Sequence, residues 1–355
     1  MFLFPLPPGF GQTAYVSPAP AIYLPAPTVD GNSPGVWVGG NLKVFTSTGE
    51  PILMSGPGLP YLSPAQPPVI SPTDHFPIWI ESVWRDDDGT IYAWYHHEPG
   101  GLCGGKLTAP EIGGLVSTDN ARSFQDLGIV LSSGDPVNCG ARNGFFAGGH
   151  GDFSVILDRD RHYFYFLFTN YGGPAATQGI GIARMAFEDR AQPAGSVYKL
   201  ARGKWDEPGI GGAITPILPA SKAWERSDAE SFWGPAIHWN TALERYVVLL
   251  NRVCCRPEWP QEGIYVMFGQ DLSDAATWTR PWKILNDSQI GFAPGYYPQV
   301  FGTGSGDTDS IAGELPRLFI KGVSKWHLSF SIDDPADTEA LENTLASPGA
   351  GARSR

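Results

Sequence analysis

The chain has 355 residues, of which 44 are Gly, 33 Pro, 12 Trp, 13 Tyr and 19 Phe, and only 17% are charged. This composition favours many short strands and tight turns over long surface helices, so we expect an all-β fold. The formal net charge of −12 is spread along the chain and would repel phosphate backbones, which argues against a nucleic-acid partner. No apolar run approaches the roughly 20 residues that span a bilayer, so no membrane partner is expected.

The two ends of the chain differ in composition from the middle. The start, MFLFPLPPGFGQTAYVSPAPA, lacks a basic region and has prolines where the apolar core of a signal peptide would lie. We expect residues 1–26 to form a disordered arm, with a damaged export signal as the alternative. The tail over 333–355, rich in Ala, Ser, Gly and Asp, is also expected to be disordered. The compartment stays open, with secretion or a periplasmic location slightly favoured over the cytoplasm.

The cysteines are Cys103, Cys139, Cys254 and Cys255. They are too few for a disulfide scaffold and show no CxxC spacing typical of zinc sites. The adjacent pair could form a vicinal disulfide, but we favour two buried or free thiols.

Strand-like runs alternate with Gly, Pro and Asp turns along the chain. Five stretches repeat one pattern, a short strand, a turn and a longer aromatic strand. They lie at 35–49, 82–98, 153–168, 236–252 and 299–332. In three of them Pro34, Pro235 or Pro298 stands two places before a Val or Ile, which suits the first residue of a strand, where no ladder hydrogen bond is lost.

Further strands follow several of these units, which gives about four strands every 50 to 80 residues, as in propeller blades. We therefore predict a five-bladed β-propeller over residues 27–332. Its blades are expected to start near Asp30, Ile80, Asp152, Gly234 and Tyr297. A sandwich or two unrelated β-domains are the alternatives.

The first strand of each propeller blade lines a central channel, so the residues at its start converge on one funnel. Here they are acids, an amide, a histidine and aromatic rings. This combination is typical of a carbohydrate site, where rings stack on sugar faces and two carboxyl groups divide acid and base work. The predicted set is Asp30, Asn32, Trp79, Glu81, His150, Asp152, Glu230, Trp233, Tyr296 and Tyr297.

The blade pattern resembles the five-bladed propeller glycoside hydrolases of families 43, 32 and 130. GDFSVILDRDRHYFYF (151–166) is similar to their segment in which an Asp opens an innermost strand before a D-x-D turn and an aromatic strand. STDNARSF (117–124) resembles the Asp-box of sialidase-type propellers, and GQDLSDAATW (269–278) is a looser version. The resemblance covers about residues 27–330.

The resemblance implies three acids with different roles. Asp30 on the first blade would be the base or nucleophile, and Asp152 on a middle blade would orient the substrate and tune pKa values. Glu230, just before Gly234 on the fourth blade, would be the general acid, with Glu81 in reserve. It implies a carbohydrate partner, a monomer and no required cofactor, although a structural divalent ion can lie near the propeller axis, where His150 has room to face the channel.

Other interpretations remain at this stage. Seven scattered histidines lack HExxH or comparable spacing, so no catalytic metal is indicated. His96 and His97, with Glu98, form either a polar ligand-binding group or a turn whose polar groups are all hydrogen-bonded, and Asp152 could be a turn residue.

A non-catalytic carbohydrate-binding propeller is the main alternative to the glycoside hydrolase function. A sialidase-like enzyme is the third, and would bring arginines such as Arg142, Arg252 and Arg256 to the channel.

Overall fold

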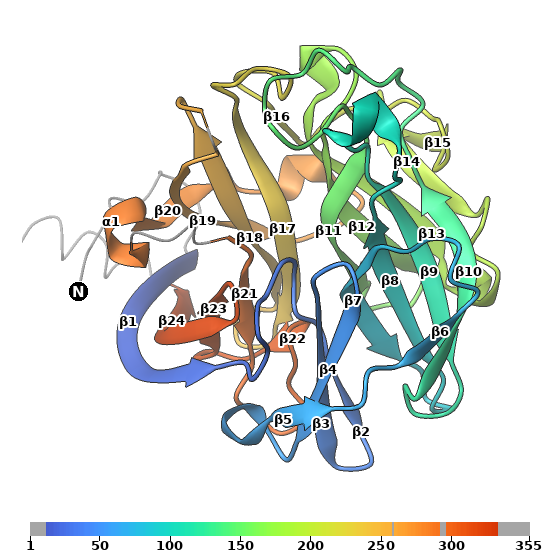
Figure 1. Ribbon diagram of the computed structural model, residues 1–355. Helices are drawn as coiled ribbons and strands as arrows, with labels where there is room; N and C mark the ends of the chain where they lie inside the picture. The colour runs from blue at the N-terminus through green and yellow to red at the C-terminus, as the bar shows by residue number, and fades with distance from the viewer. Residues whose placement is uncertain (1–11, 258, 292–295, 333–355) are drawn as a thin grey trace, which may run out of the picture.

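The computed structural model describes residues 12–257, 259–291 and 296–332. Its strands form five sheets arranged as the blades of a propeller, which confirms the predicted fold (Figure 1). The innermost strands start near the predicted positions.

The first blade contains β2 (Gly35–Val38), β3 (Asn41–Ser47), β4 (Pro51–Gly56) and β5 (Ser63–Ala65). The second contains β7 (Ile78–Arg85), β8 (Ile91–His97), β9 (Glu111–Ser117) and β10 (Ser123–Leu131), with β6 (Val69–Ser71) parallel to β10. The third contains β11 (His150–Leu157), β12 (Tyr163–Asn170), β13 (Gly179–Ala186), β14 (Val197–Ala201) and β15 (Lys204–Pro208), and β16 (Leu218–Pro219) pairs with β13.

The fourth blade contains β17 (Glu230–Asn240), β18 (Arg245–Cys254), β19 (Gln261–Gly269) and β20 (Trp282–Asn286), followed by the short helix α1 (Asp287–Ile290). The fifth contains β21 (Pro298–Phe301), β23 (Arg317–Ile320) and β24 (Val323–Ile332), while β22 (Ile311–Ala312) pairs in parallel with β17.

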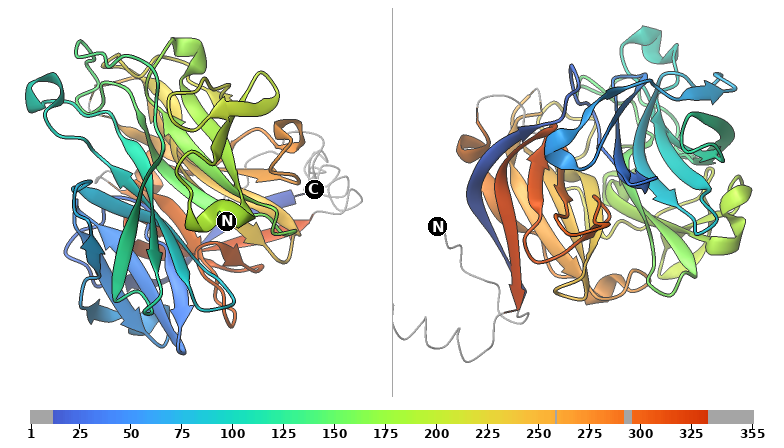
Figure 2. Two further views of the ribbon diagram at one scale, coloured as in Figure 1. Left: turned by 90° about the vertical axis from the view of Figure 1, so that its right-hand side faces the viewer. Right: turned by 90° about the horizontal axis from the view of Figure 1, so that it is seen from below.

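The N-terminal segment completes the fifth blade. Strand β1 (Gln12–Tyr23) pairs antiparallel with β24, so the first and last described strands lie side by side (Figure 2). The expectation of a disordered arm over 1–26 is therefore wrong for residues 12–23, whereas 1–11 and the predicted disordered tail over 333–355 lie outside the described residues. Pro18 and Pro20 lie within β1, which tolerates them because an outermost strand needs hydrogen-bond donors on one side only.

Apolar layers between neighbouring blades form the core. Most of β12 is buried, in agreement with its nearly continuous apolar sequence YFYFLFTN. Between the second and third blades, the ring of Trp94 lies 5.1 Å from that of Phe164 and 5.8 Å from that of Phe166, centroid to centroid. Aromatic strands thus hold adjacent blades together by burial of both faces.

The cysteines are paired, contrary to the prediction of thiols. Disulfides join Cys103 to Cys139 and Cys254 to Cys255. The first pair is separated by 36 residues. Cys103 lies in the loop between β8 and β9 and Cys139 in the loop between β10 and β11, and sequence spacing does not reveal that these loops are close. The second pair follows directly from adjacency, with Cys255 in a left-handed conformation at φ 76°.

The Asp-box segment forms the turn between β9 and β10. Asp119 accepts hydrogen bonds from the backbone N–H groups of Arg122 and Ser123 and from both the Ser117 and Ser123 hydroxyls. Burial alone would raise the pKa of Asp119, but these hydrogen bonds lower it to about 2. The charge thus stabilises an outer hairpin, and Asp119 does not line the pocket described below.

Candidate active site

A pocket of about 240 Å³ opens where the innermost strands begin. Acids, one histidine and aromatic rings line it. The lining residues are Asp30, Trp79, Glu81, His96, Glu98, Phe145, Phe146, Asp152, Trp233, Trp259, Tyr296 and Tyr297. Seven of the ten predicted site residues are in this set; Asn32, His150 and Glu230 are not.

Bulges on three neighbouring innermost strands shape the pocket. The β7–β8 pairing skips Glu81, the β11–β12 pairing skips Asp152, and the β17–β18 pairing shifts between Trp233 and Ala236. A bulged residue leaves the regular alternation of the strand, so its side chain can be turned toward a site. Asp152 also has a left-handed backbone at φ 40°, a conformation that Asp and Asn tolerate better than most residues. Asp152 is therefore a bulged strand residue that lines the pocket, and not a turn residue before a hairpin.

Glu81 is almost fully buried, with 2% of its surface exposed. Its Oε2 accepts the backbone N–H of Phe153 at 2.8 Å. Burial, followed by the nearby charge of Asp152, raises the pKa of Glu81 from 4.5 to about 8. At neutral pH this carboxyl group therefore retains its proton, the state required of a general acid.

Asp152 lies beside Glu81 and is also buried. Its Oδ2 accepts the hydroxyl of Tyr171, a residue that the sequence analysis did not single out. Burial raises the pKa of Asp152, while His96 and the Tyr171 hydroxyl oppose the rise. The Tyr171 hydroxyl thus stabilises the charge of Asp152, and this charge in turn raises the pKa of Glu81.

His96 connects Asp152 to Glu98. Its Nδ1 accepts the backbone N–H of Asp152 at 3.1 Å, and its Nε2 lies 3.3 Å from Glu98 Oε1. Burial lowers the pKa of His96, but the hydrogen bond to Glu98 and the surrounding carboxylates raise it to about 9. A proton on Nδ1 would face the Asp152 N–H, so His96 becomes charged only when this hydrogen bond is lost, and only the charged ring lowers the pKa of Asp152.

Asp30 is the exposed acid of the pocket. The surrounding protein raises its pKa, Lys321 lowers it, and Glu98 raises it further. Contact with solvent and the Lys321 charge limit the rise in the pKa of Asp30, so the pocket combines one exposed and one buried carboxyl group.

Asn32 and His150 are structural in this arrangement. Asn32 Nδ2 donates to the backbone oxygens of Phe153 at 2.8 Å and Pro235 at 3.3 Å, so it ties the first blade to the third and fourth. His150 is fully buried and packs 4.8 Å from the ring of Phe168. Burial holds the pKa of His150 well below its ordinary value, so the ring is neutral.

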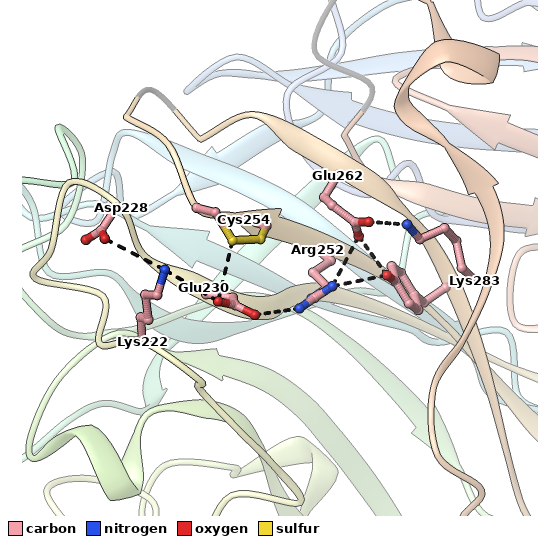
Figure 3. The surroundings of a disulfide bond; sticks show 9 residues. Lys222, Asp228, Glu230, Arg252, Cys254, Glu262 and Lys283 are labelled. Carbon is pink, nitrogen blue, oxygen red and sulfur yellow. Dashed lines mark hydrogen bonds and ion pairs between the residues drawn. A yellow bond between two sulfur atoms is a disulfide. The ribbon is translucent and has the colours of Figure 1, made fainter.

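Glu230 lies apart from the pocket, in a network of ion pairs (Figure 3). Its Oε1 accepts from Arg252 Nη2 at 2.6 Å, and Lys222 Nζ lies 3.6 Å from its other oxygen. Arg252 continues to Glu262, which also pairs with Lys283. The structure does not bring Glu230 together with Asp30 and Asp152, because these cations hold it on the fourth blade.

The sialidase interpretation requires several arginines in the channel. No Lys or Arg is among the described residues that line the pocket, and Arg142, Arg252 and Arg256 all lie outside that lining.

Aromatic rings form one wall of the pocket. Trp259 lies 5.2 Å from the ring of Trp233, whose ring lies 5.1 Å from that of Tyr296. The hydroxyl of Tyr296 donates to the backbone oxygen of Trp259 at 2.7 Å. Phe145, Phe146 and Trp259 were missed from the sequence. The paired phenylalanines in the glycine-rich segment before Asp152 were a usable signal, whereas the loop of Trp259 offered none.

Three buried groups could hold a metal ion. Glu81, His96 and Asp152 each offer one ligand atom, and these atoms lie within 4.8 Å of one another. The fit is incomplete, because amide N–H groups already occupy Glu81 Oε2 and His96 Nδ1 and because His96 Nε2 faces Glu98. A metal ion would have to displace these hydrogen bonds.

In the described part of the chain, no helix has the length and apolarity required to cross a membrane. No family model and no curated protein matches the chain. Among solved structures, a thermostable family-43 glycoside hydrolase is 12% identical, with a TM-score of 0.50, and the match covers 94% of this chain and all of that one. This likeness shows that the two proteins share the five-bladed propeller fold.

Two further solved structures are less similar. A family-43 endo-arabinanase from Bacillus licheniformis is 15% identical with a TM-score of 0.48, covering 89% of this chain and 98% of that one. An endo-1,5-α-L-arabinanase from Thermotoga petrophila RKU-1 is 13% identical with a TM-score of 0.47, covering 87% and 72%.

Proposed function

We propose that the protein is a glycosidase that cleaves a glycosidic bond in the pocket at the start of the innermost strands. The observation that carries the proposal is that two acids of one pocket lie in different surroundings. Buried Glu81 has a pKa of about 8, whereas Asp30 is exposed in the same pocket. Two carboxyl groups whose surroundings separate their pKa values are the requirement for acid and base roles.

In the proposed reaction, Glu81 donates its proton to the glycosidic oxygen as the bond to the sugar carbon breaks. Asp30 either takes a proton from the attacking water or attacks the sugar carbon itself, in which case water then releases the sugar. Asp152 orients the substrate and, by its charge, keeps the pKa of Glu81 high. Trp79, Trp233 and Tyr297 offer rings to the sugar faces.

The charge of the pocket indicates the kind of sugar. Four carboxyl groups line it, and none of the described lining residues is Lys or Arg. An anionic sugar would meet repulsion that the neighbouring Lys321 offsets only in part, so we expect neutral glycosides to be the substrates.

A carbohydrate-binding propeller is the second candidate. The observation in its favour is that Glu81 is only 2% exposed and already accepts the Phe153 N–H, as a structural carboxyl group would.

Hydrolysis of nitrophenyl pentosides and hexosides and of plant and bacterial oligosaccharides separates the two candidates. The wild type should cleave at least one compound, and Asp152→Asn should lose activity while keeping the left-handed backbone that Asn accepts. Glu230→Gln is the matched control and should remain active. Binding of sugars without cleavage by all three proteins, with circular dichroism unchanged, would support the binding module instead.

A further inference from the structure

The pocket is small. Its volume of about 240 Å³ is below the roughly 300 to 1,000 Å³ of sites that hold drug-sized ligands, so it accommodates about one sugar ring. If one ring of a glycan occupies the pocket, the ring on the other side of the scissile bond lies at its rim. The residues of the rim therefore decide which leaving group is accepted.

Phe145 is an exposed aromatic ring at this rim. It lines the pocket, yet 50% of its surface is open to solvent. Its ring meets that of Trp259 edge to face, with centroids 5.0 Å apart and planes at 65°. Phe146, its neighbour in sequence, is buried at 8% exposure, so the two rings serve different purposes.

The backbone that carries Phe145 is firmly held. Asn143 is buried, and its side-chain oxygen accepts the N–H groups of Phe145 and Phe146 at 2.8 Å each. Its side-chain nitrogen donates to the backbone oxygens of Phe146 and Trp224. The Phe145 backbone oxygen accepts the N–H of Thr108 at 3.0 Å.

A covalent link adds to this support. The Cys103–Cys139 disulfide ties the loop before Asn143 to the loop between β8 and β9, which also carries Thr108. A preorganised ring loses little freedom when a ligand covers it, so rigid aromatic residues at a rim are effective binding surfaces.

We propose that Phe145, held by Asn143 and the Cys103–Cys139 loop, is the binding platform for a second, neutral sugar ring next to the pocket. This proposal rests on the proposed function, because the pocket itself must hold the first sugar. The second ring stacks its apolar face on the exposed part of Phe145, and the site thereby prefers a sugar over a small alcohol as leaving group.

Binding measurements test the platform without requiring turnover. Titration calorimetry would compare xylose with xylobiose, arabinose with arabinobiose and galactose with galactobiose, all in an Asp30→Asn background that prevents cleavage. The disaccharide that binds should be about tenfold tighter than its monosaccharide, the size expected from covering half of an aromatic ring. In Phe145→Ala this ratio should fall to about one.

Three further variants define the result. Phe145→Tyr should preserve the ratio because it keeps a flat ring, whereas Phe145→Leu should reduce it. Tyr198→Ala removes a ring that is similarly exposed, at 44%, outside the pocket lining, and should leave the ratio unchanged. Equal ratios with and without Phe145→Ala in the Asp30→Asn background would overturn the platform while the pocket remains a sugar site. Absence of any sugar binding to the wild-type pocket would overturn the proposed function and the platform together.

Discussion

Two clusters of ionisable residues each contain an acid on an innermost strand, Glu81 on β7 and Glu230 on β17, and their surroundings give these acids opposite properties. The acid cluster consists of Glu81, His96 and Asp152, all buried. The ion-pair network consists of Lys222, Asp228, Glu230, Arg252, Glu262 and Lys283 (Figure 3). Glu81 opens into the pocket from β7, whereas Glu230 begins β17 and pairs with cations.

The counter-ions account for the difference. Burial would raise the pKa of Glu262, but hydrogen bonds from Lys283 and Tyr265 lower it. The acid cluster has no Lys or Arg among the described residues that line its pocket, so burial and neighbouring carboxylates dominate and the pKa of Glu81 rises. A position on an innermost strand thus brings an acid near the channel, and its partners determine whether it can exchange protons there.

Loss of the exposed acid should produce the largest effect. Asp30→Asn removes the proposed base or nucleophile, and kcat should fall by about 10³-fold or more. Steady-state hydrolysis of the best glycoside in the panel measures this, with circular dichroism as the control for folding. Retention of more than about a tenth of wild-type activity would remove Asp30 from the mechanism.

The raised pKa of Glu81 should appear in the pH dependence of activity and stability. In the proposed reaction Glu81 acts as a protonated acid, so kcat/KM should fall as the pH rises through about 8. Glu81→Gln should lose about 10²-fold on oligosaccharides and less on nitrophenyl glycosides, whose leaving group needs less protonation. A wild-type pH profile in Glu81→Gln would contradict this role.

The same group should affect unfolding. The folded protein keeps the Glu81 proton up to about pH 8, whereas an unfolded glutamate releases it near 4.5. The free energy of unfolding should therefore decrease as the pH rises between these values, and this decrease should be smaller in Glu81→Gln. Urea unfolding at several pH values measures it; parallel curves for the two proteins would show that Glu81 does not carry a raised pKa.

A smaller effect is expected from the hydrogen bond between Tyr171 and Asp152. Because the Tyr171 hydroxyl lowers the pKa of Asp152, Tyr171→Phe should raise it further and move the acidic limb of the pH profile to higher pH. We expect kcat to fall by about tenfold, as for the loss of one hydrogen bond to a charged group. An unmoved acidic limb would show that Tyr171 only packs.

The ion-pair network should matter least for activity. Glu230→Gln weakens a half-buried pair with Arg252, so the free energy of unfolding should fall by about 1 kcal/mol and kcat should change by less than about threefold. Thermal unfolding and hydrolysis measure the two effects. A loss near 10²-fold in kcat would instead support Glu230 as the general acid and would show that the ion-pair network also takes part in catalysis.

The sequence predicted the blades because their strands alternate with turn residues and begin near recurring prolines. It also predicted the pocket acids Asp30, Glu81 and Asp152, since these stand at the starts of innermost strands. It could not predict Tyr171, which donates to Asp152 from a loop, or Trp259, which reaches the pocket from another loop, because both depend on contacts between distant segments. Glu230 was misleading because its strand position suggests a channel acid, whereas Arg252, 22 residues away, holds it elsewhere.

The pairing of β1 with β24 has a consequence for biosynthesis. Residues 12–23 leave the ribosome before any of the blades, but their partner strand, residues 323–332, is made only after the first four blades. The first four blades can begin to form from neighbouring segments, while β1 must wait unpaired until residues 323–332 have emerged. Pro18 and Pro20 make this waiting strand a poor template for pairing with other chains, so the same residues that suit an outer strand also protect the nascent protein from aggregation.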